Sequence, residues 1–276
     1  MRVDARGLTF EVTAGGPSDG VPVLLLHGFP QHSGEWDDVV PALHAAGLRT
    51  YALDQRGYSP GARPTAVADY RIPELVADVV AVLDALGLDA VHLVGHDWGA
   101  IVAWAVAAGH PDRVRTLTAV SVPHPAAMAY ALANDGQQKA RSSYISLFRK
   151  PGTAEKVLLA WHATALRKML GAVGDAARVD RYAAPMREPE ALTAALNWYR
   201  AMSRADLAGV GPVAAPTTYV WSDRDVAIGR TAAEACAANV TGAYRFVQLT
   251  GVSHWIPDTA PGPLAEAILT RAGGTA

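Results

Sequence analysis

A short motif in the middle of the chain has the composition of a turn that presents a carboxylate. The sequence Gly-His-Asp-Trp-Gly occupies residues 95–99, directly after the apolar run 91–94. A side chain on such a sharp strand-to-helix turn adopts a strained backbone and projects above the sheet, so the residues two before and two after it must be small. Gly95 and Gly99 meet this need. Asp97 is therefore a candidate nucleophile, and capping of the following helix is its alternative role.

Two further stretches with catalytic side chains follow later strands. The apolar run 217–221 leads into Ser-Asp-Arg-Asp at residues 222–225, and the run 245–249 leads into a loop that carries His254. A nucleophile, then a carboxylate, then a histidine, each after a separate strand, is the chain order of one group of catalytic triads. The carboxyl ends of parallel strands meet at one edge of a sheet, so these side chains are expected to converge with Asp97.

The stretches that position these residues alternate between patterns typical of strands and patterns typical of helices. Short runs rich in β-branched residues alternate with longer Ala- and Leu-rich stretches of helical period. This alternation is typical of βαβ units that build a parallel sheet covered by helices on both faces. Gly87 is expected to end the second helix. The expected strands are residues 21–26, 50–53, 91–94 and 114–122, and the expected helices are residues 36–46, 72–86 and 100–108.

The alternation then gives way to a block without a recognisable buried strand, whose helical patterns lie at residues 156–170 and 190–202. A crossover between parallel strands needs only about a dozen residues, so a helical block this long is predicted to be a lid. Strands return at residues 217–221 and 245–249, each followed by a helical stretch, at 229–238 and 263–271. We expect an α/β core of residues 1–124 and 209–276 and a helical cap (lid) domain of residues 125–208.

The composition excludes several classes of partner. The 276 residues include 24 Lys and Arg against 26 Asp and Glu, a net charge of −2, so no strong field favours nucleic acid or an anionic membrane. The single cysteine, Cys236, rules out a disulfide framework and a thiolate metal site. No signal peptide is recognisable, and no apolar run approaches the ~20 residues that span a bilayer. We expect a cytoplasmic protein with no metal or other cofactor, and leave a homodimer open.

Three motifs together give the chain a family resemblance. They are His-Gly-Phe-Pro at residues 27–30, Asp-Gln-Arg-Gly-Tyr-Ser at residues 54–59 and the motif at residues 95–99. With them the chain resembles α/β-hydrolase-fold enzymes of the epoxide hydrolase and haloalkane dehalogenase branch over essentially its whole length. The resemblance implies a mostly parallel central sheet, helices on both faces and an inserted helical lid. Within the second motif, Arg56 is expected to pair with Asp54 and fix the loop.

The resemblance also assigns roles to the triad. By its position relative to Trp221, Asp225 rather than Asp223 corresponds to the family's triad acid. A carboxylate gains little from attacking an ester and instead displaces a leaving group at saturated carbon, which forms an alkyl ester. Asp97 would therefore attack an epoxide or an alkyl halide. His254, oriented by Asp225, would then activate the water that hydrolyses the ester.

Backbone groups and aromatic side chains complete the site that the resemblance implies. The N–H groups of Phe29 and Trp98 would form an oxyanion hole during ester hydrolysis, and a cis bond between Phe29 and Pro30 would help to aim the first of them. The same two side chains and Trp198 are expected to line the substrate pocket.

Two tyrosines favour an epoxide as the substrate. Tyr144 and Tyr199 lie in segments that resemble the lids of soluble epoxide hydrolases at the positions of their two ring-opening tyrosines. A neutral phenol can polarise the ring oxygen and protonate the alkoxide formed on opening. The expected function is hydrolysis of a small uncharged apolar epoxide by water to a vicinal diol.

Three alternatives stay open at this stage. A haloalkane dehalogenase would bind halide through the indole N–H of Trp98 together with Trp161 or Trp198. A fluoroacetate dehalogenase would hold the substrate carboxylate with arginines one and four residues after the nucleophile, but these positions are Trp98 and Ile101. A receptor without turnover is compatible with the fold, although the triad argues for chemistry.

Overall fold

The computed structural model describes residues 1–273 and contains an eight-stranded sheet. The strands lie in the order β1-β2-β4-β3-β5-β6-β7-β8, and strands β3 to β8 pair in parallel. The expected parallel sheet is thereby confirmed. The strand bounds are Arg2–Ala5 (β1), Leu8–Gly15 (β2), Val21–Leu26 (β3), Leu48–Asp54 (β4), Val91–His96 (β5), Val114–Val120 (β6), Thr217–Arg224 (β7) and Tyr244–Ser253 (β8).

The first two strands form an antiparallel hairpin that the sequence pattern did not predict. β1 pairs with β2, and β2 pairs antiparallel with β4. Phe10 and Val12 of β2 are buried while their neighbours are partly exposed, as in a strand with one covered face. The hairpin forms the edge of the sheet opposite β8.

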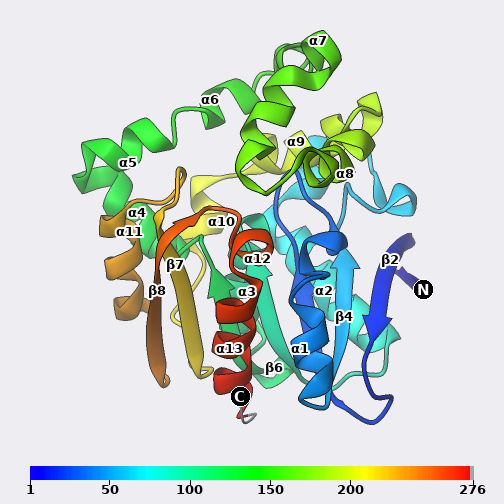
Figure 1. The fold of residues 1–276 in the computed structure, drawn as a ribbon, viewed down its shortest axis with the longest axis vertical. Helices are drawn as coiled ribbons and strands as arrows, with labels where there is room; N and C mark the ends of the chain where they lie inside the picture. Colours follow the sequence, from blue (N-terminus) through cyan, green and yellow to red (C-terminus); the bar gives the residue numbers. More distant parts are fainter. Residues whose placement is uncertain (274–276) are drawn as a thin grey trace.

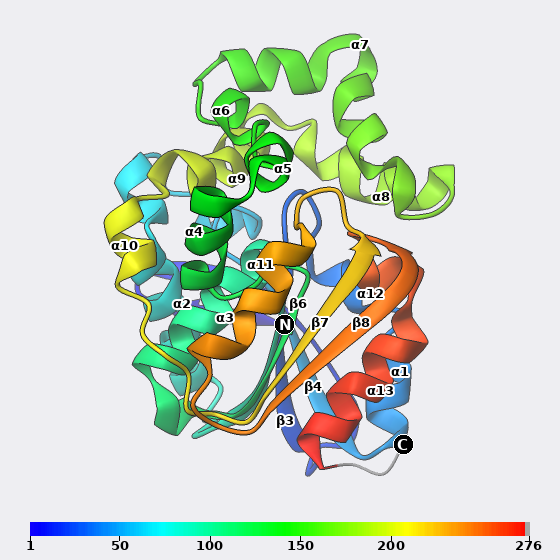
Figure 2. The same ribbon diagram turned by 90° about the vertical axis from the view of Figure 1, so that its left-hand side faces the viewer.

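Helices cover both faces of the sheet, as expected. In Figure 2, α1 and α13 lie on one face and α2, α3 and α11 lie on the other. Leu24 and Leu26 of β3 belong to the apolar cluster of the α2 and α3 face, whereas Val23 and Leu25 belong to the cluster of the α1 and α13 face. Successive side chains of a strand point to opposite faces, so this strand is buried on both sides. The helix bounds are Val40–Ala45 (α1), Ile72–Ala85 (α2), Trp98–Gly109 (α3), Arg230–Glu234 (α11), Ile256–Thr259 (α12) and Pro261–Ala272 (α13).

Between β6 and β7 the chain is helical, and we call residues 125–208 the helical insertion. Figures 1 and 2 show most of it above the edge of the sheet where the parallel strands end. The expected helix 156–170 is part of α7, which carries non-helical backbone angles from Ala160 to Ala163. The bounds are Pro125–Asn134 (α4), Gly136–Arg141 (α5), Ile145–Phe148 (α6), Thr153–Met169 (α7), Ala176–Met186 (α8), Pro189–Ala201 (α9) and Arg204–Ala208 (α10).

Short 3-10 helices join several of these elements, and one corrects an expected helix. The sequence predicted a single helix over residues 36–46, but the structure has a 3-10 turn followed by α1. Pro41 stands in the first turn of α1, where the missing N–H of proline is tolerated, so the α-helix starts there. The 3-10 helices are Ser33–Trp36, Pro60–Ala62, Val67–Tyr70, Pro111–Arg113, Leu170–Ala172 and Ala235–Asn239.

The end of α2 agrees with its predicted cap. The helix ends at Ala85, and Gly87 follows with φ of 67°, the left-handed conformation that glycine adopts at low cost. Among residues 1–273, no helix is both long enough and apolar enough to cross a membrane.

The expected ion pair between Arg56 and Asp54 is wrong. Arg56 donates from Nε and Nη2 to the two carboxylate oxygens of Asp78 on α2, over 2.5 and 2.7 Å. Asp54 instead accepts from the backbone N–H of Ser33 over 2.7 Å. Both members of the Arg56–Asp78 pair are buried, so its two parallel hydrogen bonds fasten the loop after β4 to α2.

Candidate active site

Neighbouring strands bring five groups to one edge of the sheet. β3, β5, β6, β7 and β8 lie side by side and run parallel, so their carboxyl ends point the same way. The residues that follow these ends are all buried. They are Phe29 after β3, Asp97 after β5, Ser121 after β6, Asp225 after β7 and His254 after β8.

Asp97 sits on a strained turn that only small neighbours permit. Its φ of 49° and ψ of −117° lie in a region that non-glycine residues rarely occupy. A Cβ atom on Gly95 would lie 2.2 Å from the carbonyl oxygen of Gly99, and one on Gly99 would lie 2.1 Å from that of Leu26. Asp97 precedes α3, but its side chain makes no capping hydrogen bond to that helix. The alternative capping role therefore does not explain this aspartate.

Asp225 and His254 meet beside Asp97. Nδ1 of His254 lies 3.0 Å from each carboxylate oxygen of Asp225, and its Nε2 lies 3.7 Å from Oδ2 of Asp97. Asp223 points elsewhere and accepts from the N–H of Gly251 over 2.7 Å. The geometry thus brings Asp225, and not Asp223, against the imidazole.

The electrostatics of this cluster favour a charged imidazole between two carboxylates. Burial by itself would lower the pKa of His254, but the charge and hydrogen bonds of Asp225 and Asp97 outweigh it and raise this pKa to about 10. Burial would likewise raise the pKa of both carboxyl groups, yet the neighbouring imidazole holds each of them below its usual value. At neutral pH, Asp97 is therefore ionised and His254 is protonated.

Ser121 is a member of the cluster that the sequence reading missed. Its Oγ donates to Oδ2 of Asp225 over 2.7 Å and lies 2.9 Å from Nδ1 of His254. Its φ of 66° is unusual for serine, and the hydroxyl of Tyr219 donates to its carbonyl over 2.5 Å. The sequence predicted a strand over residues 114–122, which placed Ser121 inside the strand. In the structure β6 ends at Val120, and Ser121 starts the loop that follows it.

Of the two backbone N–H groups predicted to form an oxyanion hole, one donates a hydrogen bond to Asp97 in the structure. The backbone N–H of Phe29 donates to Oδ1 of Asp97 over 2.8 Å, and the Phe29–Pro30 bond is cis. Trp98 is the first residue of α3, so its N–H belongs to the first helical turn and has no acceptor within the helix. The N–H of Phe29 therefore lies against the carboxyl group of Asp97, and the N–H of Trp98 is left without an acceptor in its own helix.

A buried pair of side chains, Glu35 and His96, contacts the backbone of His254. Nε2 of His96 lies 3.0 Å from the carbonyl oxygen of His254, so this nitrogen donates. Its Nδ1 lies 3.2 Å from Oε2 of Glu35, and burial raises the pKa of Glu35 to about 7. The sequence reading assigned no role to either residue, although His96 belongs to the motif around Asp97.

A cavity of about 590 Å³ opens over Asp97 beneath the helical insertion. Tyr144 and Tyr199 line it, and both come from the helical insertion. Burial above all, together with the charge of Asp97, raises the pKa of both phenols, so both stay protonated. The rest of the lining is mainly apolar and includes Trp98, Ile101, Met128, Leu132, Ile145 and Met202.

Two expected pocket residues are placed differently. Trp98 lines the cavity, but Phe29 and Trp198 are not among its lining residues. Trp198 is buried and its indole N–H donates to the carbonyl oxygen of Arg56 over 2.9 Å. The ring of Phe29 packs edge-on against Tyr199, with centroids 5.4 Å apart. A helical period alone does not tell a side chain that lines a cavity from one that packs behind the lining.

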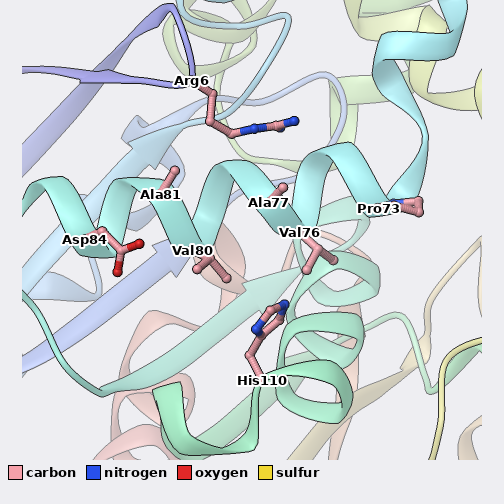
Figure 3. A pocket seen from close by; sticks show the side chains of 8 residues that line it. All are labelled: Arg6, Pro73, Val76, Ala77, Val80, Ala81, Asp84 and His110. Carbon is pink, nitrogen blue, oxygen red and sulfur yellow. The ribbon is translucent and has the colours of Figure 1, made fainter.

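A smaller cavity of about 370 Å³ lies along α2, away from these residues. Figure 3 shows it between Arg6 and His110, with Val76 and Val80 of the helix exposed to it. None of the triad residues lines it.

The fold and the site agree with a family match. The model of the alpha/beta hydrolase fold family matches residues 21–261, and the chain belongs to this family. Within it, the chain is similar to Epoxide hydrolase A of Mycobacterium tuberculosis, with 33% identity across 97% of this chain and 95% of that protein. It is also 32% identical to AB hydrolase superfamily protein YfhM of Bacillus subtilis, with the same shares covered.

Solved structures lead to the same branch. Epoxide Hydrolase A from Mycobacterium thermoresistibile superposes with a TM-score of 0.86 at 28% identity, over 99% of this chain and 98% of that one. An epoxide hydrolase from metagenomes of hot environments gives a TM-score of 0.88 at 28% identity, over 100% and 98% of the two chains. The resemblance to the epoxide hydrolase branch is thus confirmed.

Proposed function

We propose that the chain is an epoxide hydrolase that forms vicinal diols through a covalent ester on Asp97. The observation that carries the proposal is the cavity that is lined by an ionised carboxylate, that of Asp97, and by two protonated phenols, those of Tyr144 and Tyr199. We further propose the division into a core of residues 1–124 and 209–276 and a cap of residues 125–208, with the cap supplying both phenols.

The first step is alkylation of the carboxylate. A carboxylate oxygen of Asp97 bonds to one ring carbon of the epoxide, and the bond from this carbon to the ring oxygen breaks. The released oxygen takes a proton from Tyr144 or Tyr199, so no free alkoxide builds up. The raised pKa of both phenols keeps them protonated before the epoxide arrives.

The second step is hydrolysis of the ester. Alkylation removes the charge of Asp97, which is one of the causes that raise the pKa of His254. The proton that the imidazolium loses restores the phenol that was deprotonated in the first step, and the neutral imidazole then acts as a base. Asp225 stabilises the charge that returns to the imidazole when it takes a proton from water. Water attacks the carboxyl carbon of Asp97, and the N–H groups of Phe29 and Trp98 stabilise the developing oxyanion. Collapse of this intermediate releases the diol and restores the carboxylate.

The dehalogenase alternatives receive less support. Trp161 is 87% exposed, and the indole N–H of Trp198 is already engaged, so neither is ready to bind halide beside Trp98. The cavity lining next to Asp97 contains Trp98 and Ile101 in place of the two arginines that would hold fluoroacetate.

An assay that compares both chemistries tests the function. The protein is expected to form diols from aryl and alkyl epoxides and to release little halide from chloroalkanes or fluoroacetate. Diol formation is measured by chromatography and halide release by ion chromatography at equal enzyme concentration. Rapid halide release without any diol would overturn the proposal.

Ser121 is proposed to tune the acid of the triad, and Ser121→Ala tests this role. The Ser121 hydroxyl lowers the pKa of Asp225 by donating to it. Without this hydroxyl, Asp225 is more basic and stabilises the imidazolium of His254 more strongly. The pH at which ester hydrolysis reaches half its maximal rate is therefore expected to rise by about half to one unit, the shift that a hydrogen bond of about 1 kcal/mol produces. Single-turnover hydrolysis rates between pH 6 and 10 measure this midpoint.

Ser222→Ala is the matched control for this experiment. Ser222 is also buried, but its hydroxyl donates to the carbonyl oxygen of Ser253 and not to a triad residue. The control is expected to keep the parent midpoint. If Ser121→Ala lowers only the melting temperature and leaves the midpoint unchanged, Ser121 serves packing alone.

A further inference from the structure

The short helix α5 of the helical insertion packs against the loop that carries Asp225. We call this loop, residues 225–229, the acid loop; it follows β7 and leads to α11. It folds around the carboxylate of Asp225, whose Oδ1 accepts from the backbone N–H groups of Ala227 and Ile228 over 2.8 and 2.9 Å. Figures 1 and 2 both show α5 above α11. The position of the acid loop therefore fixes the carboxylate that faces His254.

Gln138 of α5 bridges two backbone groups of the acid loop. Its Nε2 donates to the carbonyl oxygen of Ala227 over 2.8 Å, and its Oε1 accepts from the N–H of Gly229 over 2.7 Å. The side chain is fully buried, and a Cβ atom on Gly229 would lie only 3.2 Å from the same Oε1. Because a buried backbone group that loses its partner costs free energy, this amide determines where the acid loop can lie.

Two further residues of the same segment hold the chain on either side of the acid loop. Nη1 of Arg141, one turn after Gln138, donates to the carbonyl oxygen of Asp225 over 2.5 Å. Asp135, the N-cap of α5, accepts from the hydroxyl of Thr231 over 2.8 Å. Contacts with residues 225–231 thus extend from the N-cap of α5 to its last residue.

The same helix leads directly to one of the two phenols. Nε2 of Gln138 also donates to Oγ of Ser142, and the N–H of Ser142 donates to the carbonyl oxygen of Gln138, both over 3.0 Å. Tyr144 follows two residues later, and both Ser142 and Tyr144 line the cavity over Asp97. A displacement of α5 would therefore change the positions of the triad acid and of this phenol together.

We propose that Gln138 and Arg141 are positioning residues, which hold Asp225 and the phenol of Tyr144 in fixed positions relative to Asp97. They act through these groups and touch no reacting atom. The inference rests on the proposed epoxide hydrolysis and deepens it, because α5 then couples the alkylation step to the hydrolysis step. Each step needs a group within hydrogen-bond distance of its partner, and a displacement of about 1 Å can reduce a rate by about 10²-fold.

Single-turnover kinetics of Gln138→Ala test the proposal. This variant leaves the N–H of Gly229 and the carbonyl oxygen of Ala227 without their partner, so the acid loop is expected to shift away from its parent position. Alkylation by an epoxide and hydrolysis of the ester are each expected to slow by about tenfold.

The pH profile of hydrolysis gives a second measurement on the same variant. The pH at half-maximal rate is expected to fall by about half a unit, since a displaced Asp225 stabilises the imidazolium of His254 less. The other titratable groups around this imidazole are unchanged by the substitution. They are Asp97, which is esterified in this step, and His96, whose ring lies 5.1 Å from that of His254 and which pairs with Glu35.

A double-mutant cycle with Tyr144→Phe separates positioning from a general loss of structure. In the Tyr144→Phe background, Gln138→Ala is expected to leave alkylation at the rate of the single Tyr144→Phe variant, because the hydroxyl through which it acts is absent. The matched control is Gln137→Ala, since Gln137 is the neighbouring residue of α5 and its side chain is exposed. This control is expected to keep both rates of the parent enzyme.

Arg141 supplies a second set of variants, which tests the proposal even if Gln138→Ala does not fold. Arg141→Gln is expected to slow hydrolysis and to lower its pH at half-maximal rate in the same way. Arg141→Lys keeps a donor for the carbonyl oxygen of Asp225 and is expected to restore most of the parent rate. Melting curves measured by circular dichroism verify that each variant is folded at the temperature of the assay.

Two results would overturn the positioning role. One is parent rates with an unchanged pH profile in folded Gln138→Ala or Arg141→Gln, and the other is an equal loss of alkylation rate with and without the hydroxyl of Tyr144. Failure of the proposed function looks different, since the parent enzyme would then form neither a diol nor an ester on Asp97.

Discussion

His254→Gln is expected to trap the enzyme as a covalent ester. Asp97 attacks as a carboxylate and needs no general base for this step, and the N–H of Phe29 still donates to it in this variant. Alkylation is therefore expected to proceed, whereas activation of water is not. Intact-protein mass spectrometry after mixing with an epoxide should show a species heavier by one substrate molecule. Turnover is expected to fall by about 10³-fold or more, in the range that removal of a general base produces.

Two control variants make this result specific. Asp97→Asn should give neither diol nor adduct, because the amide is a poor nucleophile. His92→Gln should behave like the parent, because His92 lies on β5 beside Thr116 and its ring contacts no triad residue. If His254→Gln forms no adduct from an epoxide that the parent hydrolyses, the stepwise role of His254 is refuted.

Loss of both phenol hydroxyls is expected to slow the alkylation step. Tyr144→Phe and Tyr199→Phe should each reduce its rate about 10- to 100-fold, because the remaining phenol still protonates the ring oxygen. The double variant should lose about 10³-fold or more, as expected when general acid catalysis is removed. Stopped-flow single turnovers separate this rate from binding, and the substrate concentration at half-saturation should change little.

The exposed Tyr130 of α4 offers a matched control for the tyrosine pair. Tyr130→Phe removes a hydroxyl from the same insertion and is expected to leave alkylation at the parent rate. If the double variant alkylates at the parent rate, Tyr144 and Tyr199 serve packing and not catalysis. Tyr199 already makes such a packing contact, since its ring lies edge-on to Trp98 with the centroids 5.0 Å apart.

Short-range patterns in the sequence were enough to predict which three side chains meet at the candidate site, namely Asp97, Asp225 and His254. A sharp turn that presents an aspartate needs small residues two positions before and after it, so Gly95 and Gly99 mark Asp97 within five residues. Asp225 and His254 follow recognisable strands, and a parallel sheet brings the ends of its strands to one edge. The fold class followed from the same hydrophobic periods, because strands buried on both faces differ clearly from amphipathic helices.

The partners of those groups were decided by the tertiary structure. Ser121 reaches Asp225, and Arg56 reaches Asp78 rather than the nearby Asp54, only because separate segments pack within hydrogen-bond distance. Hydrophobic periodicity predicts which face of a helix or strand is buried, but it does not predict which side chain of another element packs against that face.

The pocket was decided in the same way. Its lining depends on how the helical insertion packs over the sheet, so Trp198 lies outside the lining while Arg149 and Arg204 belong to it. By itself, the sequence determined that an aspartate, a histidine and a second carboxylate meet at one edge of the sheet. The packing of the insertion determined which molecules can reach them, because the walls of a cavity come from residues that are distant in the chain.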